Sequence, residues 1–324
     1  MKINYSELFK FIIFSAILSI SITAITGLIP NPPDASIIGT EYYGLPIYWL
    51  TKIPLQNETN FIVTNFVLDF LIFFTISGLS LYFISRRRTG VQRSKGLKFI
   101  TIFSLSAFLT KIVSEFIHEV LGHGLFVLLF GGTITKIDIS LSWPYEFSSI
   151  GWSGSFTGWQ MAWIHGGGIL ISLIFTGIIQ AFLVLKVVKN WASTSALLWL
   201  SFWTFLNPTG YLIIGGISPF GDISDLINDG ILTKQISLFI GLSIFLLGLF
   251  SLSKIFSDII YRTELAADKR KIRFYLFLFW LLIFPLTVVA FLGHDWSIVY
   301  LLMGLIPAFA SLFIPIKTQA KKFP

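Results

Sequence analysis

Three residues in one apolar stretch have the side chains of a metal-dependent hydrolase. The run from 115 to 124 reads Glu-Phe-Ile-His-Glu-Val-Leu-Gly-His-Gly, so that Glu119 follows His118 directly and His123 comes five residues after His118. Imidazole nitrogens are common zinc ligands, and a glutamate beside them can take a proton from water. Because burying ionisable side chains inside a bilayer costs free energy, this group indicates a functional site and not a role in packing alone.

The spacing of the two histidines demands a local distortion of the helix. In the zincin motif the histidines are four residues apart, whereas here they are five apart. On a regular α-helix of 3.6 residues per turn, that spacing turns the two imidazoles about 140° away from each other. A single π-bulge absorbs one residue and restores a common face, and the glycines at 122 and 124 ease it. The alternative is that His118, Glu119 and His123 are buried polar groups that pair between helices, as we expect for Lys111 and Glu115 four residues apart.

A third metal ligand is expected from the end of another apolar stretch. The stretch at 193–217 is interrupted by Asn-Pro-Thr-Gly at 207–210 and leads to Asp222 through a Gly- and Pro-containing segment. Irregular backbone at membrane depth is tolerated only where it lines a cavity or is covered by protein, so Asp222 can fold back to the histidines. Asp225 and Asp229 are alternative ligands, and an aspartate that caps the next helix is the structural alternative.

His165 is a further candidate, either as an additional ligand or as a substrate contact. It lies one turn into the following apolar stretch, before three glycines at 166–168 that favour a close contact between helices. Its structural alternative is a histidine at the membrane interface.

Composition indicates the surroundings of these residues. The chain has 324 residues, a mean hydropathy of +0.82 and only 12% charged residues, against about a quarter in soluble domains. This excludes a water-soluble enzyme, and the lack of cysteine excludes thiolate metal sites. A helix crosses a bilayer in about 20 apolar residues, and about eight stretches qualify. They are 9–29, 61–85, 99–130, 161–188, 193–217, 235–257, 274–293 and 297–316.

The predicted fold is therefore an all-α polytopic membrane protein with about eight transmembrane helices. An alternating Thr-Ile-Thr-Lys-Ile-Asp run at 133–138 predicts a small β-hairpin or loop element after the third helix, and the interruption at 207–210 predicts a broken fifth helix. We divide the chain into a two-helix segment at 1–98, a core at 99–230 that contains the candidate site, and a three-helix segment at 231–324.

The net charge of +7 is a signal of topology. With the N-terminus in the cytoplasm, nearly all of the 23 Lys and Arg residues fall on the cytoplasmic side of eight spans; the exceptions are Lys52, Lys136, Lys234 and, within a span, Lys111. This follows the positive-inside rule and predicts a multi-pass protein of the cell membrane with both termini in the cytoplasm. The candidate site then lies towards the outer half of the membrane. The bilayer is the expected partner, and nothing indicates binding of nucleic acid.

Residues 99–230 resemble the site-2 protease family of intramembrane zinc metalloproteases. The resemblance rests on His118-Glu119 with Gly122-His123-Gly124 on a membrane helix, the strand-like run after it, the glycines at 166–168, and an Asn-Pro stretch that ends in Gly221-Asp222. It implies that His118, His123 and Asp222 hold Zn²⁺, that Glu119 activates water and that Asn207 assists.

The leading hypothesis is a zinc-dependent intramembrane metalloprotease that hydrolyses membrane-embedded peptide bonds in a membrane-protein substrate or partner helix. A metal-dependent lipid hydrolase would use the same site. The non-catalytic alternative is an integral membrane subunit, or an inactive protease relative, in a larger complex. A proton or ion pathway through Lys111, Glu115 and Asp69 is a weaker alternative.

Overall fold

The chain folds into two compact units in a computed structural model. The structure describes residues 5–27, 29–33, 37–53, 58–86, 90–139, 148–262, 268–281, 283 and 304–315. The first unit contains residues 1–104 and 281–305, and the second contains residues 105–280 and 306–324.

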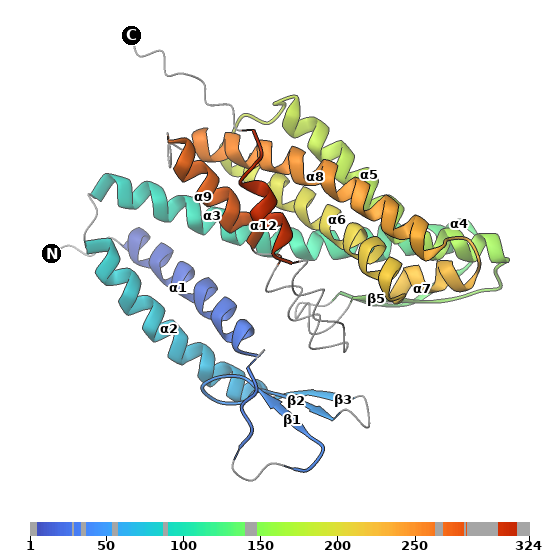
Figure 1. Cartoon of the computed structure of the whole chain (residues 1–324), viewed down its shortest axis with the longest axis horizontal. Coiled ribbons are helices and arrows are strands. Elements are labelled where there is room, and N and C mark those ends of the chain that lie inside the picture. Colours follow the sequence, from blue (N-terminus) through green and yellow to red (C-terminus); the bar gives the residue numbers. More distant parts are fainter. Residues whose placement is uncertain are drawn as a thin grey trace. The chain divides into compact units, whose positions relative to one another are not determined.

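Two helices, a small sheet and the beginning of α3 (Gly90–Phe116) make up most of the described part of the first unit (Figure 1). Helix α1 (Tyr5–Thr26) packs against α2 (Val63–Arg86), and an antiparallel sheet joins them in the order β1-β2-β3. The strands are β1 (Glu41–Tyr43), β2 (Leu50–Ile53) and β3 (Glu58–Phe61). The sequence did not reveal this sheet, because its strands are only three or four residues long. The Asp69 carboxylate accepts a hydrogen bond from the backbone N–H of Ile47 at 3.1 Å, which gives it a structural role.

Long helices dominate the second unit. Helix α6 packs against both α5 and α8. In chain order the helices are α3 (Gly90–Phe116, which begins in the first unit), the π-helix η2 (Ile117–Gly124), α4 (Leu125–Leu129), α5 (Gly158–Val184), α6 (Trp191–Ile217), α7 (Gly221–Asn228), α8 (Lys234–Arg262), α9 (Lys269–Leu281) and α12 (Ile306–Ser311). The buried side chains between α5, α6 and α7 include Ile169, Leu212, Ile223 and Leu226.

Four described helical segments are long and apolar enough to cross a membrane: Lys98–Leu129, Gly158–Val184, Trp191–Ile217 and Lys234–Arg262. They correspond to four of the eight predicted spans. Helices α1 and α2 coincide with the first two predicted stretches, but the apolar part of α2, Val63–Gly78, is short. Most of the predicted stretches at 274–293 and 297–316 lies outside the described residues. The structure thus supports a multi-helix membrane protein, and the number eight stays a prediction.

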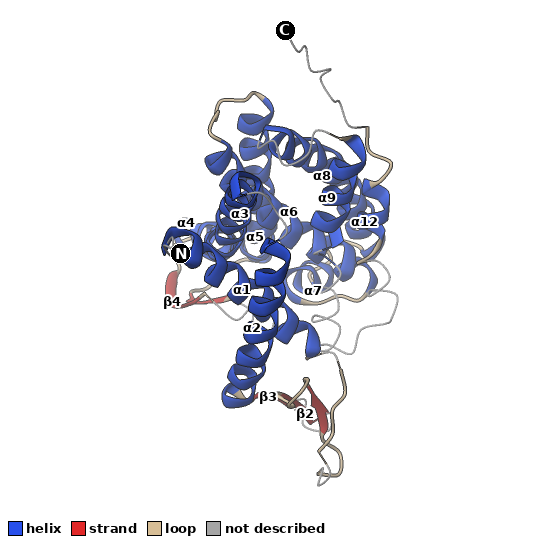
Figure 2. Ribbon diagram, turned by 90° about the vertical axis from the view of Figure 1, so that its left-hand side faces the viewer, coloured by secondary structure: helices blue, strands red, loops and turns tan. Residues whose placement is uncertain are grey.

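The predicted hairpin after the third span is confirmed. Strands β4 (Thr133–Asp138) and β5 (Ser149–Ser153) pair antiparallel with an irregularity between Ile134 and Lys136. Among the described residues, strands occur only in this hairpin and in the sheet of the first unit, and the remainder is helix or loop (Figure 2).

The predicted break at 207–210 is wrong. Helix α6 continues through Pro208 to Ile217, and its backbone leaves the helix only at Ser218. Pro208 lacks the N–H that would bond to the carbonyl of Thr204, so it costs the helix one hydrogen bond, a loss that membrane helices tolerate through local adjustments. The chain folds back later, through Ser218-Pro219-Phe220, and α7 follows.

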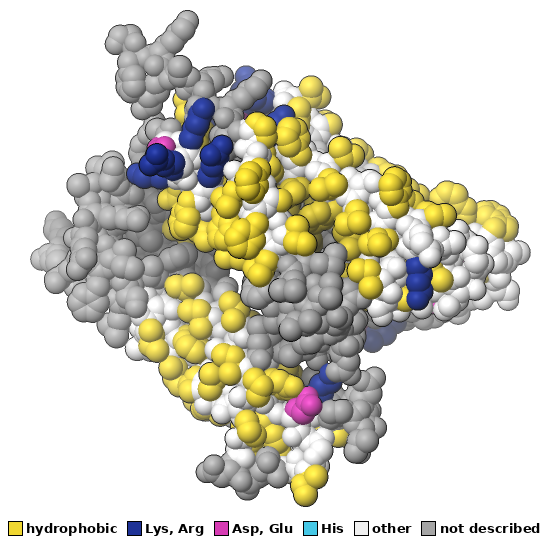
Figure 3. All heavy atoms as spheres, in the orientation of Figure 1, with side chains coloured by type: hydrophobic (Ala, Val, Ile, Leu, Met, Phe, Trp, Pro, Cys, Tyr) yellow, Lys and Arg dark blue, Asp and Glu magenta, His cyan; other side chains and the backbone are white. Residues whose placement is uncertain are grey.

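The surface of the second unit is apolar along its helices, as a lipid environment requires (Figure 3). Large exposed hydrophobic side chains on α8 include Phe239, Leu246 and Leu247. Basic side chains gather where α8 ends and α9 begins, in agreement with Arg262 in the last turn of α8 and the Lys-Arg-Lys-Ile-Arg start of α9. Apolar flanks with a basic end are typical of a helix bundle that meets a membrane interface.

Candidate metal centre

The helix changes its pitch at the two histidines. Between α3 and α4 the backbone forms the π-helix η2 (Ile117–Gly124), which contains both His118 and His123. Because π-helical hydrogen bonds join residues five apart, the two imidazoles come to the same face. The π-bulge predicted from their spacing is therefore confirmed, and both side chains are buried, as is Glu119.

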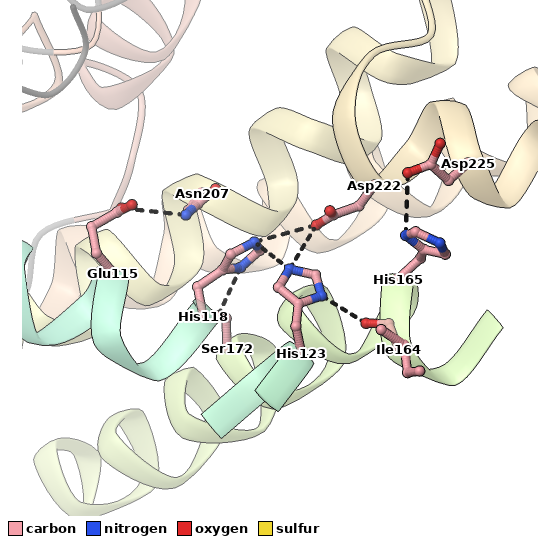
Figure 4. Close-up of polar contacts among 9 residues, drawn as sticks. All are labelled: Glu115, His118, His123, Ile164, His165, Ser172, Asn207, Asp222 and Asp225. Atoms are coloured by element: carbon pink, nitrogen blue, oxygen red, sulfur yellow. Dashed lines mark hydrogen bonds and ion pairs between the residues drawn. The ribbon is translucent and has the colours of Figure 1, made fainter. Parts of the chain in front are cut away.

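Three atoms that could bind a metal ion, which we call the donor atoms, converge from η2 and α7 (Figure 4). The Nε2 atoms of His118 and His123 are 3.4 Å apart. The Oδ2 atom of Asp222 lies 3.2 Å from Nε2 of His118 and 3.5 Å from Nε2 of His123. These three atoms form a nearly equilateral triangle.

The Oδ2 atom of Asp222 is buried and accepts no well-aligned hydrogen bond, although two ring nitrogens lie close to it. The attraction between the Asp222 carboxylate and the two rings is electrostatic. Burial raises the pKa of the Asp222 carboxyl, but the positive charges that His123 and His118 can carry lower it by more and hold that pKa well below its usual range. A buried ionised oxygen without an aligned donor is suited to a cation.

Glu119 completes a group that could bind a metal ion. Its carboxylate and the ring nitrogens of His118 and His123 offer ligand atoms within 4.8 Å of one another. The structure thus offers two carboxylates to the histidine pair, Glu119 from the same helix and Asp222 from α7.

The second nitrogen of each imidazole has its own partner. Nδ1 of His123 lies 2.6 Å from the backbone carbonyl of Ile164, so it carries the proton and donates. Nδ1 of His118 lies 3.4 Å from the Ser172 hydroxyl. A ligating histidine commonly fixes its other nitrogen in this way, which leaves Nε2 free for the ion.

Glycines allow helix α5 and the π-helix η2 to approach each other closely. A Cβ atom added to Gly122 would collide with the backbone of Gly168, and one added to Gly167 would lie 2.5 Å from the ring of Phe126. A Cβ atom at Gly168 would lie 2.6 Å from Nε2 of His123 and 2.7 Å from Nε2 of His118. The close helix contact expected from the glycines at 166–168 is therefore present, and Gly168 faces the donor atoms.

Helix α7 delivers Asp222 by way of a glycine with a left-handed backbone. Gly221 begins α7 with a φ of +49°, a conformation that residues with a side chain rarely adopt. Ile223, which directly follows Asp222, is fully buried, and its side chain fills the space that the missing side chain of Gly215 leaves on α6. This packing fixes α7 against α6 and directs Asp222 towards η2.

The other predicted candidates lie apart from the triangle. His165 pairs with Asp225 through Nδ1 and Oδ2 at 3.2 Å, while Asp229 is an exposed residue at the end of α7. Asn207 donates from Nδ2 to Oε1 of Glu115 at 3.5 Å, and Glu115 also forms the predicted ion pair with Lys111. Asp222 is thus the aspartate that joins the histidines.

Several residues of this site gave no signal in the sequence. Tyr211 stacks on the ring of His118 with ring centres 5.6 Å apart, and Trp152 of β5 stacks on His123 at 6.5 Å. Ser172 lies four residues after Gly168, a helical spacing that puts both on one face of α5. For Tyr211 and Trp152 the only signal was aromatic character, which many residues of this chain share.

Comparisons with protein-family models, with curated proteins and with solved structures found no match for this chain.

Proposed function

We propose that this protein is a zinc-dependent intramembrane metalloprotease, with His118, His123 and Asp222 as metal ligands and Glu119 as general base. The observation that carries the proposal is the triangle of donor atoms with edges of 3.2, 3.4 and 3.5 Å. Ligand distances of about 2.0–2.2 Å in a tetrahedral zinc site imply edges of about 3.3–3.6 Å. Three protein ligands also leave a fourth position for the reaction, as catalytic zinc sites do.

Zinc, when bound, polarises a carbonyl oxygen and makes water acidic enough to ionise near pH 7. The chain supplies the rest of the chemistry. The Glu119 carboxylate accepts the proton of the attacking water and passes it to the leaving amine. Asn207 holds Glu115 one turn before Glu119, and we assign it a positioning role through that carboxylate.

The membrane setting favours substrates that share it. His118, Glu119 and His123 lie within the apolar segment Lys98–Leu129, and α5 and α6, which pack against each other, are also long enough to cross a bilayer. We infer a multi-pass protein of the cell membrane, with cytoplasmic termini and the site in the outer half. Its substrate would be a peptide segment within or at the bilayer.

The test compares metal content and hydrolysis in the detergent-purified full chain. Wild-type protein is expected to hold one zinc per chain and to cleave members of a transmembrane-peptide library in liposomes. Glu119→Gln should keep the zinc and lose cleavage by about 10²-fold or more, because the general base is gone. His118→Ala should lose the zinc.

Asp138→Asn serves as the matched control, because Asp138 is an exposed carboxylate of β4 paired only with Lys136 among the contacts described. Wild-type protein without stoichiometric metal, or full cleavage by Glu119→Gln, would contradict the proposal. Hydrolysis of a lipid extract in place of the peptides would assign the same site to a lipid ester or amide.

A further inference from the structure

Tyr211 of α6 contacts both parts of the candidate metal centre, namely His118 on η2 and the segment that leads to Asp222. Its ring is nearly parallel to that of His118, with centres 5.6 Å apart and an angle of 11°. The Tyr211 ring also stacks with Phe220, with ring centres 5.0 Å apart and an angle of 15° between the ring planes. Phe220 precedes Gly221 and Asp222, so Tyr211 contacts both the first histidine and the segment that delivers the aspartate.

One edge of the Tyr211 ring faces that segment. A Cβ atom added to Gly221 would lie 2.6 Å from Cε1 of Tyr211 and 3.5 Å from each of the neighbouring carbons, Cδ1 and Cζ, the second of which carries the hydroxyl. The stack on His118 and this contact place the phenol against both His118 and the start of α7.

No described residue forms a hydrogen bond with this hydroxyl. The described contacts of Tyr211 are ring contacts, and none of the described hydrogen bonds includes its oxygen. Tyr211 is partly buried, and its oxygen is not one of the fully buried atoms that lack a partner, so it stays open to a ligand. A phenol carries its own O–H donor. Tyr211 thus presents an unused donor beside the metal ligands.

We propose that Tyr211 is a catalytic hydrogen-bond donor, whose phenol O–H binds the carbonyl oxygen of the scissile amide and the oxyanion that develops on it. This inference rests on the proposed hydrolase function. Water adds its oxygen to the carbonyl carbon while Glu119 takes its proton; the C–N bond then breaks, and that proton goes to the leaving nitrogen. The Tyr211 proton stays on the phenol throughout, and its hydrogen bond strengthens as negative charge grows on the carbonyl oxygen.

Two substitutions separate the donor from the ring. Tyr211→Phe removes the hydroxyl and keeps the stack on His118 and Phe220, so zinc content should not change while kcat falls about 10²-fold at constant KM. Tyr211→Leu removes the stack as well, and should also weaken zinc binding because His118 loses its ring support.

A binding experiment tests the donor without turnover. The probes are a Leu-Leu phosphinic pseudodipeptide, whose oxygens imitate the oxyanion, and a thiol analogue that binds zinc through sulfur. Tyr211→Phe should weaken binding of the phosphinate about tenfold or more, since a hydrogen bond to a charged group is lost. Its affinity for the thiol should equal that of the wild type.

The zinc content of the wild type reports on the proposed function, whereas the ratio of the two probe affinities reports on Tyr211. Equal phosphinate affinity in Tyr211→Phe and wild type, with both zinc-loaded, would overturn the inference and leave the hydrolase intact. Failure of the zinc-loaded wild type to bind the phosphinate would overturn it as well.

Discussion

Gly168 occupies a position where any side chain would displace the imidazoles of His118 and His123. A Cβ atom there would lie 2.6 Å from both Cε1 of His118 and Nε2 of His123. We expect Gly168→Ala to weaken zinc binding by about 10- to 100-fold, the range found when the surroundings of metal ligands are altered. Competition with a chromophoric chelator measures the affinity.

Gly177 provides the control on the same helix. It is exposed, and a Cβ atom there would meet nothing within 4 Å. Gly177→Ala should leave zinc affinity unchanged and stabilise α5 by up to about 1 kcal/mol, because alanine loses less backbone entropy than glycine in a helix. Equal zinc affinity in the two variants would show that the glycine contact does not shape the site.

At the level of elements, the sequence was informative where chemistry constrained the backbone. Two histidines five residues apart cannot face one ion on a regular helix, so their spacing predicted the π-helix that the structure contains. The break assigned to Pro208 was wrong, because a proline inside a membrane helix removes one backbone hydrogen bond without ending the helix. The sheet of the first unit and the rings around the histidines depend on tertiary contacts that no local pattern encodes.

The start of α7 determines where Asp222 lies. Gly221 and Gly230, at the two ends of this helix, both have positive φ angles, +49° and +71°. Alanine at either position should lower the free energy of unfolding by about 1–2 kcal/mol, the cost of a left-handed backbone with a side chain. Only at Gly221 would the new methyl group also meet Tyr211, at 2.6 Å.

We therefore expect Gly221→Ala to weaken zinc binding, and Gly230→Ala to leave it unchanged at a similar loss of stability. Chemical denaturation and zinc titration of both variants separate the two effects. A parallel loss of zinc affinity in Gly230→Ala would mean that general destabilisation, and not the placement of Asp222, controls the metal.

At the scale of the whole molecule, the distribution of charge predicts which face of the membrane each loop reaches. Helix α5 separates two described loops: the one after β5, which contains Ser155, and the one before α6, which contains Val187 between Lys186 and Lys189. The positive-inside rule puts the second loop in the cytoplasm and the first outside. Ser155 and Val187 are both exposed, and the chain has no cysteine of its own.

Single cysteines at these two positions report the topology directly. Ser155→Cys should react with a membrane-impermeant maleimide in intact cells, while Val187→Cys, which keeps both lysines, should react only after permeabilisation. The opposite labelling would invert the chain and move the metal centre to the cytoplasmic half. Because His123 lies about 10 Å along the helix from Phe130 at 1.5 Å per residue, the same experiment also decides from which side water and substrate reach the zinc.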